Sequence, residues 1–172
     1  MRVYILGFMG SGKSFWGSKW ADHYAVPFID LDKQMEEAEG MIIDEIFAQK
    51  GEHYFRLLEA ATLRSTVHLE NAIIACGGGT PCFENNMEWI KSNGYSAFIE
   101  AEPDVLMKNL LEEKNKRPLI KHVNVEDLLP FIKQKLIERN VFYQQANSIL
   151  SYTELDIHSL NHLFSTQTNN HA

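Results

Sequence analysis

Short apolar runs alternate along the chain with longer stretches in which apolar residues return at helical spacing. Continuous apolar runs are typical of strands that are buried on both faces, as in a parallel sheet. Runs of this kind predict strands at Val3–Leu6, Val26–Asp32, Asn71–Cys76, Tyr95–Glu100 and Ser148–Tyr152. We therefore expect a parallel sheet of five strands.

The intervening stretches predict helices, and several have recognisable ends. Gly51 suits the position just after a helix C-terminus and Pro103 the start of a helix, while Pro130 predicts a kink or a start near Leu129. The expected helices are Lys13–Tyr24, Lys33–Glu39, Asp44–Lys50, Glu52–Glu70, Asn85–Asn93, Pro103–Glu113, Val125–Gln145 and Asp156–Phe164. Strands and helices in alternation predict an α/β fold of three layers, with helices on both faces of the sheet.

Two segments interrupt this pattern. Residues 112–125 are mostly polar and basic and contain Arg117-Pro118, which we interpret as a mobile lid. Residues 165–172 have little to bury, which favours a disordered tail. The rest, residues 1–164, is expected to be one domain, as a chain of 172 residues allows.

Composition narrows the classes of function. A hydrophobic content of 45% with no apolar run of about 18 residues predicts a protein without a membrane span, and no leader precedes the first strand, so we expect a cytoplasmic protein. A net charge of −7 argues against a nucleic-acid partner. Cys76 and Cys82 are too few for a disulfide framework or a zinc set. Small size favours a monomer.

The chemistry begins directly after the first strand. Gly7–Ser14 fits G-x-x-x-x-G-K-[S/T], a loop whose backbone N–H groups converge on nucleotide phosphates. In such a loop Lys13 supplies charge to the β- and γ-phosphates, and the Ser14 hydroxyl can ligate Mg²⁺. The alternative is a glycine-rich turn without a ligand, but this spacing of Gly-Lys-Ser rarely arises by chance.

Two further groups follow predicted strands. Asp30 and Asp32 alternate by two, so on a strand they would face the same side; one could act on Mg²⁺ and the other accept a proton from a hydroxyl. Asp32 could also cap the next helix. Gly77–Gly79 present bare backbone N–H groups at another strand end. Since ligands of α/β folds gather at the carboxyl ends of strands, we expect these groups to share one cleft with Gly7–Ser14.

The sequence resembles that of shikimate kinases over about residues 1–150. The resemblance is carried by elements that occur in a fixed order, namely Gly7–Ser14, Asp30-Leu-Asp32, the Gly51–Glu59 segment with Phe55-Arg56-x-x-Glu59, Gly77–Gly79, Arg117-Pro-Leu119 and Arg139-x-x-x-Tyr143. It implies the P-loop kinase fold with a lid and, as activity, ATP- and Mg²⁺-dependent phosphorylation of the 3-hydroxyl of shikimate, in the pathway to chorismate and the aromatic amino acids.

The resemblance also implies roles by motif position. Catalysis would fall to Lys13, Asp32 and Arg117. The residues implied in ATP binding are Gly10, Ser11, Gly12, Lys13, Ser14, Phe15 and Arg117; those in shikimate binding are Asp32, Arg56, Gly78, Gly79 and Arg139. Ser14 would bind the metal directly and Asp30 through water. Glu59 would orient Arg56, and Phe47 and Phe55 would wall the pocket.

Arginine usage fits this picture independently. A carboxylate substrate calls for forked guanidinium donors, and Arg56 and Arg139 are two of only five arginines in the chain. One departure concerns the segment before Arg117, where members often carry an arginine that stacks on adenine. Residues 108–116 hold no arginine here, so either the contact with adenine is weaker or Lys108 or Asn109 substitutes.

Two alternatives remain at this stage. A gluconate kinase-like enzyme would share the loop and one acid, but would not need the elements around Arg56 and Arg139 together. A catalytically silent nucleotide-binding regulator predicts the loss of Lys13, Asp32 or Arg117, and all three are present.

Overall fold

The computed structural model describes residues 1–112 and 124–164 of the protein. Its centre is one sheet of five strands in the order β2-β3-β1-β4-β5, with every neighbouring pair parallel. The strands are β1 (Arg2–Leu6), β2 (Phe28–Asp30), β3 (Ala72–Ala75), β4 (Tyr95–Glu100) and β5 (Ser148–Ser151). This confirms the predicted parallel sheet of five strands.

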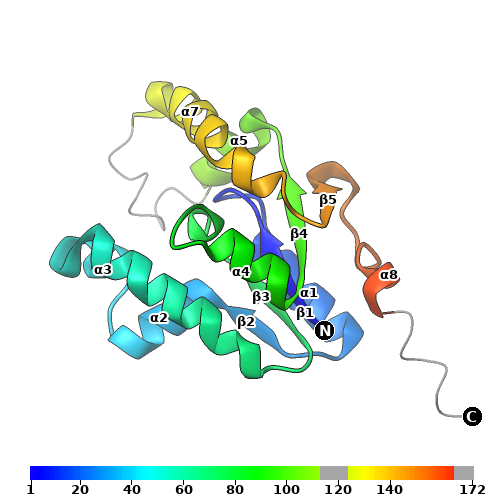
Figure 1. Ribbon diagram of the computed structural model, residues 1–172. Coiled ribbons are helices and arrows are strands. Elements are labelled where there is room, and N and C mark those ends of the chain that lie inside the picture. Colours follow the sequence, from blue (N-terminus) through cyan, green and yellow to red (C-terminus); the bar gives the residue numbers. More distant parts are fainter. Residues whose placement is uncertain (113–123, 165–172) are drawn as a thin grey trace, which may run out of the picture.

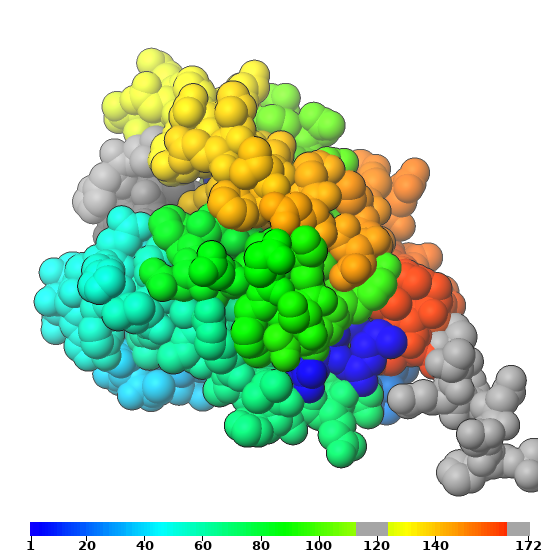
Figure 2. Space-filling model, viewed as in Figure 1, coloured from blue at the N-terminus to red at the C-terminus, as the bar shows by residue number. Residues whose placement is uncertain are grey.

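Helices cover both faces of this sheet (Figure 1). They are α1 (Lys13–Tyr24), α2 (Leu31–Glu39), α3 (Ile43–Ser65), α4 (Asn86–Asn93), α5 (Pro103–Glu112), α7 (Val125–Tyr143) and α8 (Asn161–Phe164), with single 3₁₀ turns at Thr66–His68, Thr80–Cys82 and Tyr152–Glu154. Figure 2 shows α3, α4 and α7 together on one side of the molecule, in cyan, green and yellow to orange.

The alternation of side chains along β1 explains the three layers. Tyr4 and Leu6 are fully buried in a core that takes in residues of α3, α4 and α7, whereas Val3 and Ile5 are fully buried in a second core against Trp20 of α1. Successive residues of a strand point to opposite faces, so a central strand that is apolar throughout needs a cover on each side. The α/β fold of three layers follows from that requirement.

The second strand is shorter than predicted, and this changes the place of one carboxylate. β2 ends at Asp30, whose side chain accepts a hydrogen bond from the backbone N–H of Lys33 at 3.4 Å and so caps α2. Asp32 therefore lies in the first turn of α2 and not on a strand. The prediction that both carboxylates share one face of a strand is wrong, and the capping residue is Asp30 rather than Asp32.

Gly51 lies inside α3, between the two segments that the sequence predicts as separate helices. α3 runs from Ile43 to Ser65, and Gly51 inside it has φ 80° and ψ 168°, a conformation that is not helical. Glycine adopts positive φ without the steric cost that other residues meet. The helix predicted to end at Gly51 does end there, and the next begins at once, but it stops at Ser65 rather than at Glu70.

The C-terminal elements differ more from expectation. The helix predicted for Asp156–Phe164 is confined to Asn161–Phe164. Before it, the backbone N–H of Ser159 donates to the Asp156 carbonyl at 3.3 Å and that of Asn161 to the His158 carbonyl at 2.9 Å, so these residues form turns with i to i−3 bonds instead of an α-helix. α7 begins at Val125 and contains Pro130, rather than starting near Leu129.

The proposed lid and tail fall largely outside the described residues, and Arg117 lies there too. In residues 1–112 and 124–164, no helix combines the length and apolar character needed to cross a membrane. Both cysteines are free thiols, with Cys76 buried and Cys82 partly exposed.

Candidate active site

The glycine loop leaves β1 in a conformation that requires its glycines. Gly10 and Gly12 have φ of 82° and 81°, in the left-handed region that glycine favours. Gly12 is also the residue before α1, so the backbone N–H groups of the first turn of that helix border the loop. A helix N-terminus of this kind is an anion-binding arrangement, because its N–H groups and the helix dipole both favour negative charge.

Side chains at the loop meet those of the neighbouring strand end. Ser14 Oγ donates a hydrogen bond to Asp30 Oδ2 at 2.6 Å, and Lys13 Nζ donates to the Phe8 carbonyl at 2.8 Å. Ser14 and Asp30 thus lie together, as expected for a hydroxyl and a carboxylate on either side of a Mg²⁺ ion. The described residues contain no cluster of three or more His, Cys, Asp or Glu side chains that could hold a metal ion.

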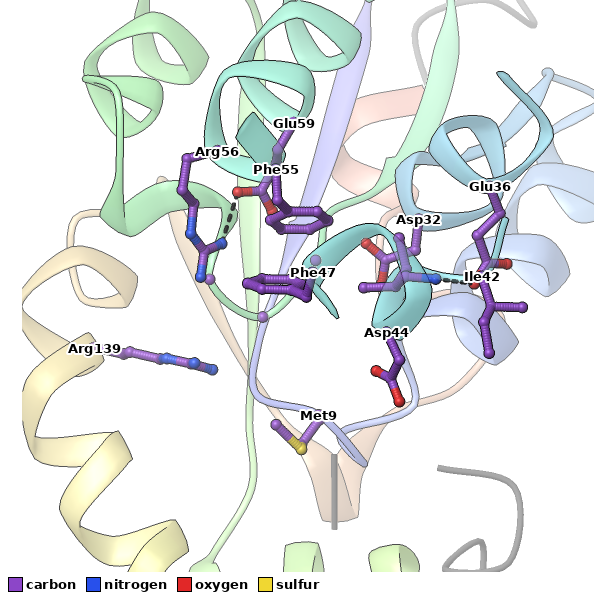
Figure 3. A pocket seen from close by; sticks show the side chains of 14 residues that line it. Met9, Asp32, Glu36, Ile42, Asp44, Phe47, Phe55, Arg56, Glu59 and Arg139 are labelled. Carbon is purple, nitrogen blue, oxygen red and sulfur yellow. Dashed lines mark hydrogen bonds and ion pairs between the residues drawn. The ribbon is translucent and has the colours of Figure 1, made fainter. Parts of the chain in front are cut away.

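A cavity of about 340 Å³ lies beside the loop, at the carboxyl ends of the strands (Figure 3). All five residues expected to bind the acceptor line it, namely Asp32, Arg56, Gly78, Gly79 and Arg139. Figure 3 shows Arg56 and Arg139 entering from one side, with Asp32, Glu36 and Asp44 on the other. The cavity therefore has a cationic end and an anionic end, which we call the acceptor pocket.

Arg56 is held at its end of the acceptor pocket by ion pairs and aromatic rings. Its guanidinium pairs with Glu59 at 2.9 Å and with Glu52 at 3.3 Å, and its Cζ lies 3.8 Å from the centre of the Phe83 ring. The rings of Phe47 and Phe55, 4.2 Å apart between centroids, line the same cavity. Cation–π contact and a charged hydrogen bond both orient the guanidinium before any ligand arrives.

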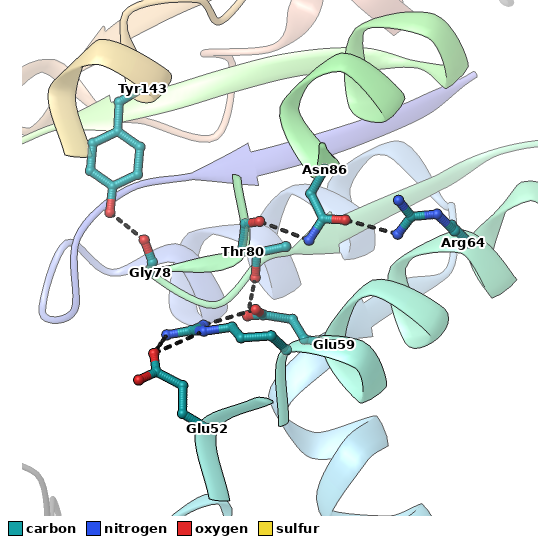
Figure 4. Close-up of polar contacts among 8 residues, drawn as sticks. Glu52, Glu59, Arg64, Gly78, Thr80, Asn86 and Tyr143 are labelled. Atoms are coloured by element: carbon teal, nitrogen blue, oxygen red, sulfur yellow. Dashed lines mark hydrogen bonds and ion pairs between the residues drawn. The ribbon is translucent and has the colours of Figure 1, made fainter. Parts of the chain in front are cut away.

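A polar network buried behind Arg56 was not predicted from the sequence (Figure 4). Glu59 is only 1% exposed and accepts from Thr80 Oγ1 at 2.7 Å as well as from Arg56. Asn86 Nδ2 donates to the Thr80 carbonyl at 2.9 Å, and Arg64 Nη1 donates to Asn86 Oδ1 at 2.8 Å. The chain of bonds ties the turn after β3 to α3 and α4, and so fixes the position of Gly77–Gly79.

Tyr143 supports the same turn from the other side. Its hydroxyl donates to the Gly78 carbonyl at 2.5 Å, and its buried ring stacks on Phe98 of β4, with centroids 4.9 Å apart. The two residues of the Arg139-x-x-x-Tyr143 motif thus have different positions in the site. Arg139 lines the acceptor pocket, while Tyr143 holds Gly78, which also lines it.

Asp32 has an environment that disfavours its charge. Burial, followed by the repulsion of Asp30, raises the pKa of Asp32 to about 6, although the nearby Lys13 ammonium opposes the shift. Gly77 allows the close approach, because a Cβ on that residue would lie 2.9 Å from Asp32 Oδ1. A carboxyl group of this kind is ionised at neutral pH and can still take up a proton at moderate cost.

A larger cavity of about 1,100 Å³ adjoins the acceptor pocket, and we call it the nucleotide cavity. Gly10, Gly12, Lys13, Ser14 and Phe15 line it, and it shares Met9, Asp32, Glu36 and Gly78 with the acceptor pocket. Ser11 is fully buried and does not line it. Trp16, Asn109 and Tyr152 also line this cavity, and none of them belongs to a sequence motif. Of the three, the sequence indicated only Asn109, as one of two residues that could replace the arginine missing from residues 108–116.

Comparisons with known proteins agree with this arrangement. The family model described as shikimate kinase matches residues 9–165. Shikimate kinase from Bacteroides thetaiotaomicron is 39% identical over 156 residues, which cover 91% of this chain and 89% of that protein. The crystal structure of a shikimate kinase from that organism covers 96% of this chain and 98% of its own, with a TM-score of 0.91 and 36% identity.

Two further structures bear on the alternatives. Shikimate kinase from Acinetobacter baumannii in complex with shikimate covers 97% of this chain and 94% of its own, with a TM-score of 0.83 and 25% identity. A gluconokinase from Sinorhizobium meliloti covers 96% and 94%, but reaches only a TM-score of 0.54 at 16% identity, so it shares the fold alone.

Proposed function

The chain belongs to the shikimate kinase family, and we propose that it transfers the γ-phosphoryl group of ATP to the 3-hydroxyl of shikimate, on the way to chorismate and the aromatic amino acids. The observation that carries the proposal is the polarity of the acceptor pocket. Arg56 and Arg139 face its interior at one end and Asp32 at the other, beside the phosphate loop. Shikimate has a carboxylate on one side of its ring and hydroxyls on the other.

Each end of the acceptor pocket suits one end of that molecule. The two guanidinium groups offer forked donors to the carboxylate, and the backbone of Gly78 and Gly79 offers donors to the ring. Asp32 accepts the hydrogen bond of the reacting hydroxyl. Phe47 and Phe55 supply an apolar wall of the pocket. The ring carbons of shikimate can therefore be removed from water while its carboxylate and hydroxyls form hydrogen bonds.

The transfer itself needs little covalent work from the protein. The 3-hydroxyl oxygen attacks the γ-phosphorus, the bond to the β-phosphate bridging oxygen breaks, and the hydroxyl proton passes to Asp32 while ADP leaves. Lys13 stabilises charge on the transferring phosphoryl group. By motif position, the backbone from Gly10 to Phe15 binds the triphosphate, and Arg117 contributes a further positive charge, although it lies outside the described residues.

Mg²⁺ is the metal that this donor set fits. Ser14 Oγ and Asp30 Oδ2 lie 2.6 Å apart at the edge of the nucleotide cavity, so an ion could take the hydroxyl as a direct ligand and reach the carboxylate through water. The ion would neutralise the β- and γ-phosphates. The proposal assigns Ser14 to direct coordination and Asp30 to the hydration shell.

We further propose a monomer that works in the cytoplasm, where ATP is supplied. In support, both cavities are lined by residues of a single chain, so catalysis needs no second copy. Sedimentation equilibrium at micromolar protein checks the monomer, and a stable dimer mass would contradict it.

A coupled assay of ADP release tests the activity. With Mg-ATP, shikimate should support turnover and gluconate should not, because gluconate lacks the ring that the acceptor pocket fits. Shikimate-independent or gluconate-dependent turnover would reject the proposal, and complete inactivity of the folded protein would instead favour a regulator that only binds nucleotide.

Two substitutions test the assigned roles. Asp32→Asn should abolish turnover while ATP binding stays nearly intact, because the amide cannot take the proton; turnover that survived would remove Asp32 as the acceptor. Arg139→Ala should chiefly raise the KM for shikimate, and an unchanged KM would take Arg139 out of the site.

A further inference from the structure

Asn109, on α5, joins the phosphate loop to Tyr152, which also lines the nucleotide cavity. Its Nδ2 donates to the Gly10 carbonyl at 2.8 Å and to the Tyr152 hydroxyl oxygen at 3.1 Å. An amide nitrogen carries two hydrogens, so it can make both bonds at once. All three residues line the nucleotide cavity, although they come from the loop after β1, from α5 and from the 3₁₀ turn after β5.

The bond to Gly10 fixes the orientation of one peptide unit of the loop. In a trans peptide the C=O of Gly10 and the N–H of Ser11 lie in one plane and point in opposite directions. The Ser11 N–H donates to the Phe8 carbonyl at 3.2 Å, and the Gly10 carbonyl accepts from Asn109. The peptide plane is therefore held at both ends. This matters because Gly10, with φ of 82° and no Cβ, can adopt other backbone conformations in which the plane would be turned over.

Packing places α5 directly against the same peptide. A Cβ on Gly10 would lie 3.1 Å from Leu110 Cγ, and Leu106 and Leu110 share a buried core with Phe8. Asn109 therefore has little freedom to move away from the loop. Its side chain is a fixed donor that α5 presents to the loop backbone.

The bond to Tyr152 fixes a second residue of the cavity lining. The Tyr152 ring lies next to the start of α1, 3.9 Å from where a Cβ on Gly12 would be, and it borders the cavity together with Trp16. Because its oxygen accepts from Asn109, the hydroxyl proton remains available for an acceptor on a ligand. An aromatic ring at this place also offers a face on which a nucleobase can stack.

We propose that Asn109 is a positioning residue for the nucleotide. By holding Gly10 and Tyr152 in one arrangement, it sets the phosphate loop and the base side of the nucleotide cavity at a fixed separation, so that a nucleoside di- or triphosphate meets both without further ordering. The inference rests on the proposed function only in requiring that this cavity takes ATP. Lys108, the other residue that could replace the missing arginine, is exposed and does not line the cavity.

The test is a double-mutant cycle read out by nucleotide binding. Asn109→Leu removes both donors at similar volume, Tyr152→Phe removes only the hydroxyl, and Lys108→Ala is the matched control on the same helix. Titration calorimetry with Mg-ADP measures the Kd of each folded variant, and steady-state kinetics separate the KM for ATP from the KM for shikimate. Thermal unfolding confirms that each variant is folded.

We expect Asn109→Leu to raise the Kd for Mg-ADP and the KM for ATP about tenfold, the scale of a lost hydrogen bond that had held the site. Tyr152→Phe should raise both about threefold, and the double variant should resemble Asn109→Leu, because the two substitutions remove one shared bond. The KM for shikimate should change less than twofold, and Lys108→Ala should match the wild type.

A purely structural Asn109 would lower the unfolding temperature and leave the Kd within twofold of wild type, and that result would overturn the inference. Additive effects of the two substitutions would also overturn it. Wild-type protein that binds Mg-ADP but does not turn over shikimate would contradict the proposed function. In that case the Kd values of the variants for Mg-ADP would still test the role of Asn109. Wild-type protein that does not bind Mg-ADP would sink both.

Discussion

Replacing Glu59 by glutamine tests whether the buried network behind Arg56 supports both stability and substrate binding. The substitution keeps the size of the side chain and an acceptor for the Thr80 hydroxyl, which donates to it at 2.7 Å. It removes the negative charge that pairs with Arg56 at 2.9 Å. In a side chain that is 1% exposed, the perturbation is therefore confined to the half of the carboxylate that faces Arg56, where an amide donor replaces a charged acceptor.

The expected loss follows from the partners that remain. A hydrogen bond to a charged group contributes about 1.5–3 kcal/mol, and breaking a buried ion pair costs about 3–5 kcal/mol. Arg56 is 12% exposed and keeps Glu52 at 3.3 Å, so its charge is not left alone. We therefore expect a loss near the lower bound, about 2 kcal/mol of unfolding free energy, which lowers the Tm of a domain of this size by roughly 4–8 °C.

The same variant should change catalysis in two ways. A less constrained Arg56 should raise the KM for shikimate about fivefold, equivalent to about 1 kcal/mol. The pKa of Asp32 is raised mainly by burial and by Asp30, and repulsion from the Glu59 carboxylate raises it further. Without that charge the pKa of Asp32 falls, and the acid limb of the kcat/KM profile for shikimate should move to lower pH.

Glu52→Gln is the matched control, because Glu52 pairs with the same guanidinium but is 62% exposed. Exposed ion pairs contribute little, so this variant should lose at most about 0.5 kcal/mol. Differential scanning calorimetry and pH-dependent kinetics on the three proteins decide the matter. Equal losses in the two variants, or a Glu59→Gln protein with unchanged Tm and KM, would refute the account of the network.

Three further predictions concern single groups. The kcat/KM for shikimate should fall about tenfold per pH unit below about 6, because Asp32, with its pKa raised to about 6 by burial and Asp30, is protonated there and cannot accept a proton; a flat profile from pH 7 to 5 would contradict this. Gly17→Ala should destabilise the protein in urea by about 1–2 kcal/mol, since the new methyl would lie 2.6 Å from the Phe28 ring and overpacking outweighs the gain in helix propensity. Gly51→Ala should cost about 1–3 kcal/mol in thermal unfolding from backbone strain alone, because φ 80° with ψ 168° is a conformation that essentially only glycine adopts and nothing beyond the adjoining helix backbone lies within 4 Å of the new methyl; a neutral result would show that the bend in α3 tolerates other residues.

Much of the fold could be predicted because local signals and tertiary packing agree. α1 and β4 have the predicted bounds, Lys13–Tyr24 and Tyr95–Glu100. Part of the acceptor pocket could be predicted as well, since Asp32 and Gly77–Gly79 follow strand ends that parallel pairing brings to one edge, whereas Arg56 and Arg139, on α3 and α7, were expected there only from the resemblance. The assignment of Asp32 to this pocket holds even though it lies on a helix, because the first turn of α2 begins where the strand ends.

The errors have local physical causes. β2 has only three residues, so the helix that Asp30 caps begins two residues before the predicted one. The backbone bonds of residues 156–161 run from i to i−3, and apolar periodicity does not distinguish such turns from an α-helix.

The contacts that the sequence could not indicate are those between side chains without fixed spacing. Arg64, Thr80 and Asn86 form one network only because α3, the turn after β3 and α4 pack together. Asn109 and Tyr152 are 43 residues apart and meet only across the folded cavity. No motif links such positions, since their spacing depends on the whole tertiary structure.

The strand order has a consequence for how the protein is made. β1 precedes the other strands of the sheet in the sequence and is the central strand, and its partners are β3 at Ala72–Ala75 and β4 at Tyr95–Glu100. It has no partner until β3 has been synthesised, and it lacks its second partner until β4 follows, at a rate of roughly 5–20 residues per second. The glycine loop that follows β1 is therefore translated early and becomes native late, so a chain that stalls before β4 carries the nucleotide-binding motif without the structure that makes it bind.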